Sequence, residues 1–361
     1  MAGTLFDRLE RDGHEQVAWY THRPSGLRAM IAIHSTALGP ALGGTRFLPY
    51  ASEDHALTDV LRLSRGMTYK AALAGLDLGG GKAVIVGDPR ALRSEALLRA
   101  YGRFVDSFGG RYITAEDVGT DQADMDLLRE ETVHVTGTSE SVGGSGDPSP
   151  ATALGLVHAL HAVVDHRFGS PSLEGCSVAV VGVGKVGAAL VRHLRAAGAE
   201  VAVADIDPVR VQAMVATHGA RALEADDALS ADVDVLAPCA LGAVLDATTI
   251  PRLRCAVVCG SANNQLAEPE GARRLADRGI LYAPDYVVSA GGIINIAEEL
   301  VGYDRARATA KLAAIGATTA RVLTDADRLG ITTIDAADRL AESRLNAAAT
   351  AGARFVGSSG R

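Results

Sequence analysis

The stretch CSVAVVGVGKVGAALVRHLRAAGAEVAVADID, residues 176–207, has the order strand, glycine-rich turn, helix, strand and acid. Its first apolar run leads into Gly182, Gly184 and Gly187, which have the spacing G-x-G-x-x-G, and an amphipathic helical pattern follows. The second apolar run ends in Asp205. This order predicts the first βαβ unit of a Rossmann-type, doubly wound domain that binds a dinucleotide.

The same motif predicts how the dinucleotide is held. Glycines allow a tight turn and a close approach of the backbone to a pyrophosphate, and the helix N-terminus adds N–H donors. Asp205 can accept hydrogen bonds from the adenosine ribose, and its charge would repel a 2′-phosphate, which favours NAD over NADP. We also assign Lys185 and Val186, inside the motif, to the cofactor site, where Lys185 fits a solvated turn residue better than a catalytic one. The alternative is an ordinary βαβ unit with a glycine turn.

The pattern along the chain predicts an α/β protein. The segment 136–150, rich in Gly, Ser and Pro, separates two series of elements and is expected to be a loop or domain junction. Before it, we expect strands at 27–34, 82–88 and 111–118 and helices at 52–67 and 94–108, each helix after a serine that can cap it. After it, we expect a helix at 151–166, strands at 233–239, 255–260 and 280–285, a glycine turn entering a helix at 287–300, and helix over 304–356.

Composition excludes several classes of partner. The 361 residues carry a net charge of −8, which argues against nucleic acid or an acidic membrane surface and favours a small molecule. The charged start and the absence of a long apolar run predict a cytoplasmic protein with no membrane contact. The four cysteines form no C-x-x-C pair and the histidines show no ligand spacing, so we expect free, buried thiols and no metal site.

Two lysines stand out in MTYKAALAGLDLGGGKAVI, residues 67–85, because the chain has only four lysines among its 35 basic residues. An amine can lose its proton when desolvated or beside another cation, whereas a guanidinium cannot. Gly79–Gly81 predict a turn that places Lys82 at the mouth of a strand. If Lys70 and Lys82 lie close together, one can serve as a cation and the other as a base. The alternative is two surface lysines.

A carboxylate partner for these lysines is expected in YITAEDVGTDQADMD, residues 112–126. Asp117 follows a predicted strand just before a glycine, where α/β folds collect ligands, and Glu116 is the nearest alternative. The three following aspartates are expected to form the exposed first turn of the next helix: Asp121, Asp124 and Asp126.

Seven motifs together resemble the glutamate/leucine/phenylalanine/valine dehydrogenase family, and especially its branched-chain members such as the actinobacterial valine dehydrogenases. They occur in the family's order between about residues 14 and 345. They are IAIHSTALGPALGGTR (31–46), GMTYKAALAGLDLGGGKAVI (66–85), YITAEDVGT (112–120), GVGKVG (182–187), APCALG (237–242), GSANNQLA (260–267) and YAPDYVVSAGGIIN (282–295).

The resemblance implies an oxidoreductase acting on CH–NH2 that oxidises an L-amino acid with NAD to a 2-oxo acid and ammonia. By position, Lys70 matches the residue that binds the substrate carboxylate. Lys82 matches the catalytic lysine, which is neutral at working pH and activates water against an iminium. Asp117 matches the aspartate that moves protons to and from the amino group. The resemblance also implies a homo-oligomer, a dimer or larger.

Further positions are carried over from the same resemblance. Thr152 matches a residue that holds the nicotinamide amide, and Cys239 and Ala240 match backbone that lines the cofactor. Asn263 and Asn264 match a pair at the nicotinamide ribose and substrate, although one could be a turn residue. Gly43 and Gly44 match a turn beside the substrate carboxylate, or are a plain turn. The chain departs from relatives that read N-A-G-G, because Ser289 stands at the first position of that motif.

The residues around the predicted pocket bear on the substrate. Glutamate-specific members have a lysine where this chain has Leu42, and without that cation a substrate side-chain carboxylate would be buried unpaired. An apolar pocket is expected from Leu42, Met67, Ala115, Ile293 and Ile296. The two isoleucines are three residues apart on one helix face, unless they are plain core, and would favour valine over phenylalanine.

We therefore expect a two-domain enzyme with its active site in a cleft between the domains. The substrate and oligomerisation domain is expected at 1–140, with the C-terminal helices 331–361 returning to it, and the NAD domain at 141–330. The expected reaction is deamination of L-valine and related branched-chain amino acids. Alternatives are a dehydrogenase of phenylalanine or another apolar amino acid and, in a different class, a non-catalytic NAD-binding regulator.

Overall fold

The computed structural model describes residues 4–240 and 242–350, which form two compact units. Unit 1 comprises the residues up to 147, residues 296–305 and the described residues from 341 onward. Unit 2 comprises residues 148–295 and 306–340. The division after residue 147 falls inside the segment 136–150. It differs from the expected ranges in three ways. The boundary lies after 147 and not after 140, residues 296–305 also belong to unit 1, and the C-terminal return begins at 341.

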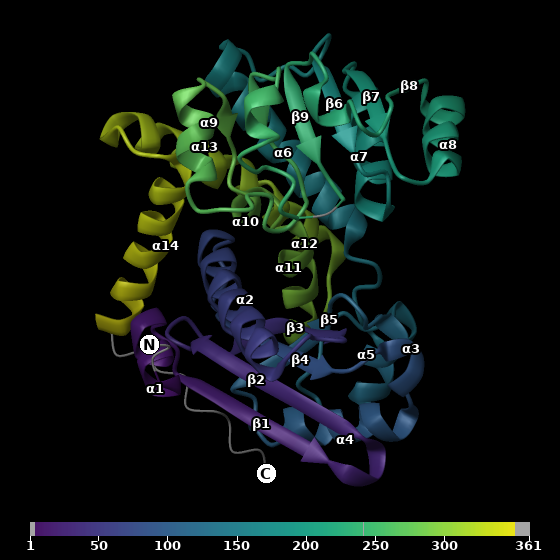
Figure 1. Cartoon of the computed structure of the whole chain (residues 1–361), viewed down its shortest axis with the longest axis vertical. Helices are drawn as coiled ribbons and strands as arrows, with labels where there is room; N and C mark the ends of the chain where they lie inside the picture. Colours follow the sequence, from purple (N-terminus) through teal and green to yellow (C-terminus); the bar gives the residue numbers. More distant parts are fainter. Residues whose placement is uncertain (1–3, 241, 351–361) are drawn as a thin grey trace. The chain divides into compact units, whose positions relative to one another are not determined.

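Unit 1 is built on a five-stranded sheet of order β1-β2-β4-β3-β5 (Figure 1). β1 runs antiparallel to β2 and β2 antiparallel to β4, whereas β4, β3 and β5 are parallel. Strands β1 and β3 were not predicted, because β1 is a half-buried edge strand and β3 contains two glycines. The strands are β1 Gln16–His22, β2 Leu27–Ser35, β3 Ala41–Leu48, β4 Gly79–Val86 and β5 Tyr112–Glu116.

Helices cover both faces of this sheet, and β2 alternates between them. Ala29, Ile31 and Ile33 join the core beneath α4, whereas Met30 and Ala32 pack under α2. The predicted serine caps are confirmed, because the hydroxyls of the residues before α2 and α4 accept backbone N–H bonds. The helices are α1 Leu5–Asp12, α2 Glu53–Leu73, α3 Pro89–Leu92, α4 Glu95–Asp106 and α5 Gln122–Arg129, with 3-10 turns η1 Arg23–Ser25, η2 Glu140–Val142 and η5 Glu298–Val301.

The glycines Gly79–Gly81 lie within β4 and not in a turn, so the predicted turn is wrong. A Cβ on Gly80 would lie 2.0 Å from the backbone nitrogen of Thr68 in α2, and one on Gly81 would lie 2.7 Å from the ring of Tyr112. Helix and sheet therefore meet backbone to backbone at this strand. The glycines are required by this close packing, and Lys82 is a mid-strand residue opposite Ala32.

Unit 2 contains a six-stranded parallel sheet of order β8-β7-β6-β9-β10-β11. In chain order this is 3-2-1-4-5-6, the order of the doubly wound Rossmann fold. The strands are β6 Ser177–Val181, β7 Glu200–Ala204, β8 Arg221–Ala222, β9 Val235–Pro238, β10 Val257–Val258 and β11 Leu281–Tyr282.

From residue 149 onward, helices occur where the sequence predicts them, but they begin and end at other residues. α6 extends the helix predicted at 151–166, and the predicted C-terminal helix is three helices, whose last predicted residues, 351–356, lie outside the described residues. The elements are α6 Ser149–Phe168, α7 Lys185–Ala196, α8 Pro208–His218, η3 Ala228–Ser230, η4 Ile250–Arg252, α9 Gly271–Asp277, α10 Asp285–Val288, α11 Gly291–Ala297, α12 Arg305–Leu312, α13 Ala314–Leu329 and α14 Thr333–Thr350. Of these, α11 and α14 continue into segments of unit 1.

The cysteines are free thiols, as predicted, but only Cys255 and Cys259 are buried. Burial raises the pKa of Cys176 and of Cys255 to about 11. Such thiols are poor nucleophiles because little thiolate forms near neutral pH. Among the helices of the described residues, none combines the length and the apolar character needed to cross a membrane.

A buried histidine joins α1, β2 and α2. The Nε2 of His34 lies 3.0 Å from the carbonyl oxygen of Asp12, and its Nδ1 lies 2.9 Å from the hydroxyl oxygen of Thr68. A carbonyl can only accept, so Nε2 carries a proton. Burial, and then the neighbouring His14, lower the pKa of His34 from 6.5 to about 4. The His34 and His14 rings meet edge to face at 4.9 Å.

This histidine predicts a loss of stability in mild acid. Between pH 6.5 and about 4 the unfolded chain binds a proton at His34 that the folded chain does not, so the free energy of unfolding should fall as pH falls through this window. The full effect is about 3 kcal/mol. We expect urea unfolding at pH 7 and pH 4.5 to show a smaller pH difference for His34→Gln than for the wild type. An equal pH difference in the two proteins would contradict the prediction.

Candidate functional site

The G-x-G-x-x-G segment forms the turn between β6 and α7. Gly182 has a φ of +100°, which L side chains rarely adopt, and a Cβ on Gly187 would lie 1.9 Å from the carbonyl oxygen of Gly182. Gly184 is the N-cap of α7 and offers no side chain to its first N–H groups. A Cβ on Gly184 would have nothing closer than the guanidinium of Arg210 at 3.8 Å. The turn therefore presents open backbone donors at a helix N-terminus, the arrangement that suits a pyrophosphate.

Asp205 lies beside this turn, directly after β7. Its Oδ2 accepts a hydrogen bond from the N–H of Val183 at 2.8 Å, and its Oδ1 accepts one from the N–H of Asp207 at 2.9 Å. Both oxygens keep acceptor capacity, because a carboxylate oxygen can take two donors. The residue is thus placed where a ribose next to the turn could donate to it. Lys185 is exposed and Val186 is half-buried in the first turn of α7.

The segment after β9 lies against the glycine turn. The N–H of Cys239 donates to the carbonyl of Val181 at 2.7 Å, and a Cβ on Gly182 would lie 2.5 Å from the Cβ of Ala240. Burial raises the pKa of the Cys239 thiol, which agrees with a lining role rather than a nucleophilic one. The structure thus brings together three separate predicted parts of the cofactor site.

The two asparagines form a strained turn in unit 2. Asn264 has a φ of +52°, and its carbonyl accepts a hydrogen bond from the N–H of Ala243 at 2.7 Å. The next residue, Gln265, is fully buried and its amide nitrogen donates to the carbonyls of Gly260 and Ala262. Non-glycine residues in the left-handed region cluster at ligand sites, so this turn is a sound candidate for a contact.

Thr152 and the S-A-G-G motif meet at the starts of α6 and α11. A Cβ on Gly291 would lie 2.2 Å from the carbonyl oxygen of Ala151, and one on Gly292 would lie 3.0 Å from the hydroxyl of Thr152. That hydroxyl donates to the carbonyl of Pro148 at 3.0 Å. Ser289 is buried in the turn between α10 and α11. The two glycines are therefore required for close approach of the two helices.

In unit 1, Lys82 and Asp117 form an ion pair. Lys82 projects from β4 with only 7% of its side chain exposed, and Asp117 follows β5 with 19% exposed. The pair uses the Oδ2 of Asp117, and its Oδ1 accepts a hydrogen bond from the N–H of Val118 at 2.8 Å. This geometry favours Asp117 over Glu116 as the partner of the lysine.

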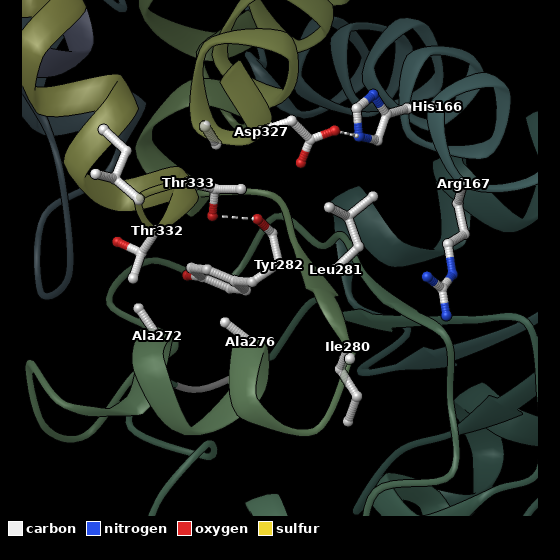
Figure 2. A pocket seen from close by; sticks show the side chains of 13 residues that line it. His166, Arg167, Ala272, Ala276, Ile280, Leu281, Tyr282, Asp327, Thr332 and Thr333 are labelled. Carbon is white, nitrogen blue, oxygen red and sulfur yellow. Dashed lines mark hydrogen bonds and ion pairs between the residues drawn. The ribbon is translucent and has the colours of Figure 1, made fainter. Parts of the chain in front are cut away.

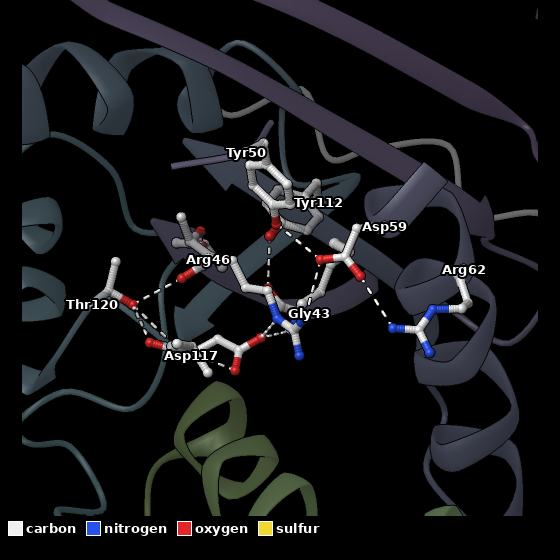
Figure 3. A network of polar contacts seen from close by, with 12 residues as sticks. Gly43, Arg46, Tyr50, Asp59, Arg62, Tyr112, Asp117 and Thr120 are labelled. Atoms are coloured by element: carbon white, nitrogen blue, oxygen red, sulfur yellow. Dashed lines mark hydrogen bonds and ion pairs between the residues drawn. The ribbon is translucent and has the colours of Figure 1, made fainter. Parts of the chain in front are cut away.

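A second cation, Arg46 of β3, binds the same carboxylate. Its Nε lies 3.0 Å from the Oδ2 of Asp117, and its Nη1 lies 3.0 Å from the Oδ2 of Asp59 in α2 (Figure 3). Burial raises the pKa of Asp117, but Lys82 and Arg46 outweigh it and hold that pKa well below its ordinary range. The carboxyl group is therefore a charged acceptor at every pH at which the protein would work.

Gly43 and Gly44 lie within β3 and not in a turn, so this prediction is also wrong. A Cβ on Gly43 would lie 1.8 Å from the carbonyl oxygen of Gly81, and one on Gly44 would lie 2.9 Å from the Cβ of Asp117. The hydroxyl of Tyr112 donates to the carbonyl of Gly43 at 2.6 Å. The pair thus leaves room for the backbone of β4 and for Asp117, directly beside the ion pair.

The other predicted substrate residues are spread over four elements, α2, β3, β5 and α11. Lys70 lies in the last turn of α2, close along the chain to Thr68, whose backbone packs on the strand of Lys82. Met67 and Ile296 are half-buried, whereas the three remaining members of the apolar set are almost fully buried, namely Leu42 at 0%, Ala115 at 3% and Ile293 at 5%. Met67 and Ile296 therefore offer the accessible apolar surface of this set.

A separate pocket of about 380 Å³ lies in unit 2 (Figure 2). His166 and Asp327 pair at 3.1 Å on its wall, and the hydroxyl of Thr333 donates to the carbonyl of Tyr282 at 2.6 Å. No residue predicted for the site lines it. Within the described part of the chain, no three His, Cys, Asp or Glu side chains gather in a way that could hold a metal ion.

Comparison with known proteins identifies the family of this chain. Residues 14–134 match the family profile described as Glu/Leu/Phe/Val dehydrogenase, dimerisation domain. Residues 143–214 and 202–352 match the profile of the Glutamate/Leucine/Phenylalanine/Valine dehydrogenases. The chain belongs to this family. Like other amino acid dehydrogenases it has a two-domain α/β fold, in which unit 2 is the Rossmann-type domain.

Individual relatives are similar over nearly their whole length. A leucine dehydrogenase from Geobacillus stearothermophilus is 51% identical over 352 residues, covering 98% of this chain and 96% of the relative. A valine dehydrogenase from Streptomyces virginiae is 54% identical over 346 residues, covering 95% and 96%. The crystal structure of the L-tryptophan dehydrogenase from Nostoc punctiforme superposes with a TM-score of 0.85 at 44% identity, covering 96% and 100%.

Several charged residues around this dehydrogenase's ion pair were not predicted. Arg46 lies in the first quoted motif, but an arginine in an arginine-rich chain carries no special signal. Asp59 and Tyr50 lie in segments without a motif, and only the fold brings them together. The prediction that Asp124 is exposed is wrong, because it is 4% exposed and pairs with Arg93 at 3.3 Å.

Glu299 was also missed. Its carboxylate accepts hydrogen bonds from the N–H of Gly137 at 3.1 Å, from the hydroxyl of Thr138 at 3.2 Å, and from the N–H and hydroxyl of Ser145 at 2.9 and 2.5 Å. It thereby joins the two segments of unit 1, 137–145 and 296–305, that lead to and from unit 2.

The glycine motif predicts different effects for two alanine substitutions. Gly187→Ala should destabilise the fold, because its Cβ would meet the carbonyl of Gly182, whereas Gly184→Ala should fold normally. Gly184→Ala should still weaken NADH binding, by at least about tenfold, because the added methyl would keep a pyrophosphate from the backbone. Thermal melts and NADH fluorescence titration of both variants measure this. Normal NADH affinity in a folded Gly184→Ala would show that the dinucleotide does not approach this turn.

Proposed function

We propose that this chain catalyses the NAD-dependent, reversible oxidative deamination of branched-chain L-amino acids, with L-valine preferred, to the 2-oxo acid and ammonia. The observation that carries the proposal is the buried pair of Lys82 and Asp117 on neighbouring parts of one sheet. Lys82 is almost fully buried beside a carboxylate, where a charged amine is costly to keep unless its charge is compensated. It suits proton transfer, because its amine can exist in both protonation states.

The residues take separate parts in the reaction. Lys70 would bind the substrate carboxylate as a cation. Asp117, held as a carboxylate by two cations, would accept a proton from the substrate ammonium group and return one to the departing ammonia. Lys82, as the free amine, would remove a proton from the water that attacks the iminium carbon. The products would be the 2-oxo acid, ammonium, a reduced nicotinamide and one proton, because the oxygen of the attacking water loses both of its protons as it becomes the new carbonyl oxygen.

NAD fits the residues present in unit 2. The Gly182–Gly187 turn and the uncapped start of α7 would hold the pyrophosphate, and Asp205 would hold the adenosine ribose. The segment at Cys239 and Ala240 and the asparagine turn would line the nicotinamide half, together with Thr152. Bound NAD would supply the hydride acceptor for the substrate Cα.

The preference for valine rests on the apolar set. Leu42 stands where a glutamate enzyme needs a cation, so an acidic substrate side chain would be left unpaired. Relatives named leucine and valine dehydrogenases are more than half identical over this chain. Ile296 and Ile293 lie on one side of α11 and would shorten the pocket, which favours a small branched side chain over an aromatic one.

Two other properties follow from the same family membership as proposals. The match of residues 14–134 to a profile described as a dimerisation domain supports a homo-oligomer, a dimer or larger, assembled through unit 1. A relative that is a tryptophan dehydrogenase makes an aromatic amino acid the main alternative substrate. A non-catalytic NAD-binding regulator remains the alternative of another class.

Activity on a panel of L-amino acids tests the reaction. We expect NADH formation at alkaline pH with valine first, then 2-aminobutyrate, isoleucine and leucine, and little with phenylalanine or glutamate. Lys82→Ala should lower kcat by at least about 10³-fold while NADH binding, measured by fluorescence, is kept. If NADH binds and no amino acid is oxidised by the wild type, the chain is a regulator.

Substitution of the half-buried isoleucine tests the specificity. Ile296→Ala should raise the ratio of kcat/KM for phenylalanine to that for valine by at least about tenfold, because each carbon removed from a fitted pocket is worth about 1 kcal/mol or more. The control is Val301→Ala, since Val301 follows closely and is 72% exposed. An unchanged ratio in Ile296→Ala would assign Ile296 to the core and remove the argument for valine.

A further inference from the structure

Charged side chains of unit 1 form a row of alternating sign that begins at the candidate catalytic pair. The row runs from Lys82 through Asp117, Arg46 and Asp59 to Arg62 (Figure 3 labels the last four). These residues come from β4, the end of β5, β3 and α2. Arg46 and Asp59 have side chains only 17% and 16% exposed. Arg62 at the end of the row is 56% exposed, whereas the inner charges are largely buried, which is costly unless each is compensated on both sides.

Arg46 is the central member of the row. Its Nε and Nη1 bind two different carboxylates, each at 3.0 Å, so its guanidinium plane is fixed by Asp117 and Asp59 together. Asp59 is held in turn, since its Oδ2 accepts a hydrogen bond from the hydroxyl of Tyr50 at 2.8 Å and its Oδ1 one from Arg62 at 3.2 Å. The guanidinium is the one side-chain cation that matches two acceptors in this way and keeps its charge at any working pH.

The proposed reaction creates a need for such a permanent cation. When Lys82 is the free amine, Asp117 loses one of its two cationic partners. The carboxylate would then take up a proton or turn away, unless another fixed charge holds the same oxygen. Arg46 binds that oxygen, Oδ2, and cannot give up its proton.

We propose that Arg46, anchored by Asp59 and Tyr50, is a positioning residue that keeps Asp117 ionised and correctly oriented while Lys82 is in its uncharged form. This inference rests on the proposed function, because it assigns Asp117 a proton-transfer role. Arg46 itself touches neither substrate nor cofactor in this scheme. Its effect is therefore expected in kcat, with the KM values for amino acid and NAD retained.

The surroundings of Asp117 define the expected pH behaviour. Lys82 and Arg46 contact it directly, and Glu116 precedes it in β5. Asp59 lies one step further away, since it binds Arg46. Tyr50 and Arg62 bind Asp59 in turn. Loss of Arg46 removes one cation from beside the Lys82–Asp117 pair, so the pair takes up a proton more readily, and the proposed reaction needs Lys82 uncharged and Asp117 ionised. The acid side of the pH–kcat profile should therefore move to higher pH.

The test compares four variants with the wild type in the direction of amino acid oxidation. Arg46→Gln should lower kcat by about 100-fold, move the acid side of the profile to higher pH and leave both KM values within about threefold. Arg46→Lys restores the charge but cannot bridge two carboxylates, so it should return the profile toward the wild type and recover kcat only in part. Asp59→Asn should lower kcat by about tenfold, because Arg46 keeps its charge and loses its anchor.

Arg28→Gln is the matched control, since Arg28 also reaches from the sheet to a carboxylate of α2, Glu53, but at the surface. It should match the wild type. Wild-type kcat and pH profile in Arg46→Gln, or a lower melting temperature with both unchanged, would overturn the proposal. If Arg46→Gln does not fold, Asp59→Asn provides the test: a lower kcat with unchanged KM values would support the proposal, and a wild-type kcat would contradict it. Failure of the wild type to oxidise any amino acid would instead refute the proposed function.

Discussion

Backbone-to-backbone packing at glycines is the constraint on which the candidate site depends. In β3 and β4, a Cβ at Gly43 would lie 1.8 Å from a carbonyl oxygen, and one at Gly80 would lie 2.0 Å from a backbone nitrogen of α2. A side chain at Gly43 would push apart β3 and β4, which carry Arg46 and Lys82, and one at Gly80 would push α2 away from β4. Because these glycines have no side chain, the strands pack closely, and three charged residues from separate strands come within hydrogen-bond distance.

Unit 2 uses the same device for a different purpose. Gly187 packs on the carbonyl of Gly182 and so brings the start of α7 close to β6, whereas Gly291 packs on the backbone of α6. At Gly187 this close packing leaves the N-terminus of α7, with its backbone N–H groups, without a side-chain cap, an arrangement that can bind an anion. At Gly291 it fixes the entry to α11, the helix that carries both isoleucines.

Close packing also explains why so many charges are buried beside the candidate catalytic pair. Two desolvated ions gain enough from one another only when the geometry is good and their remaining lone pairs and protons are satisfied. Here the Asp117 carboxylate has two cations and a backbone N–H, and Asp59 has two guanidinium groups and a hydroxyl. Such a group is stiff as well as charged, which is what proton transfer between fixed atoms requires.

Although it left both Asp117 and Glu116 as possible partners of Lys82, the sequence by itself determined the fold class, the family, the glycine turn between β6 and α7, and the choice of Lys82. These follow from local signals, because periodicity, glycine spacing and rare lysines are read along the chain. Only the tertiary structure decided that Gly43, Gly44 and Gly79–Gly81 are strand residues and not turns. It also revealed Arg46, Asp59 and Glu299. The role of a glycine depends on which atoms lie opposite it, and the role of an arginine depends on which carboxylates lie near it. Both are determined by strand order and helix packing, which local sequence patterns do not reveal.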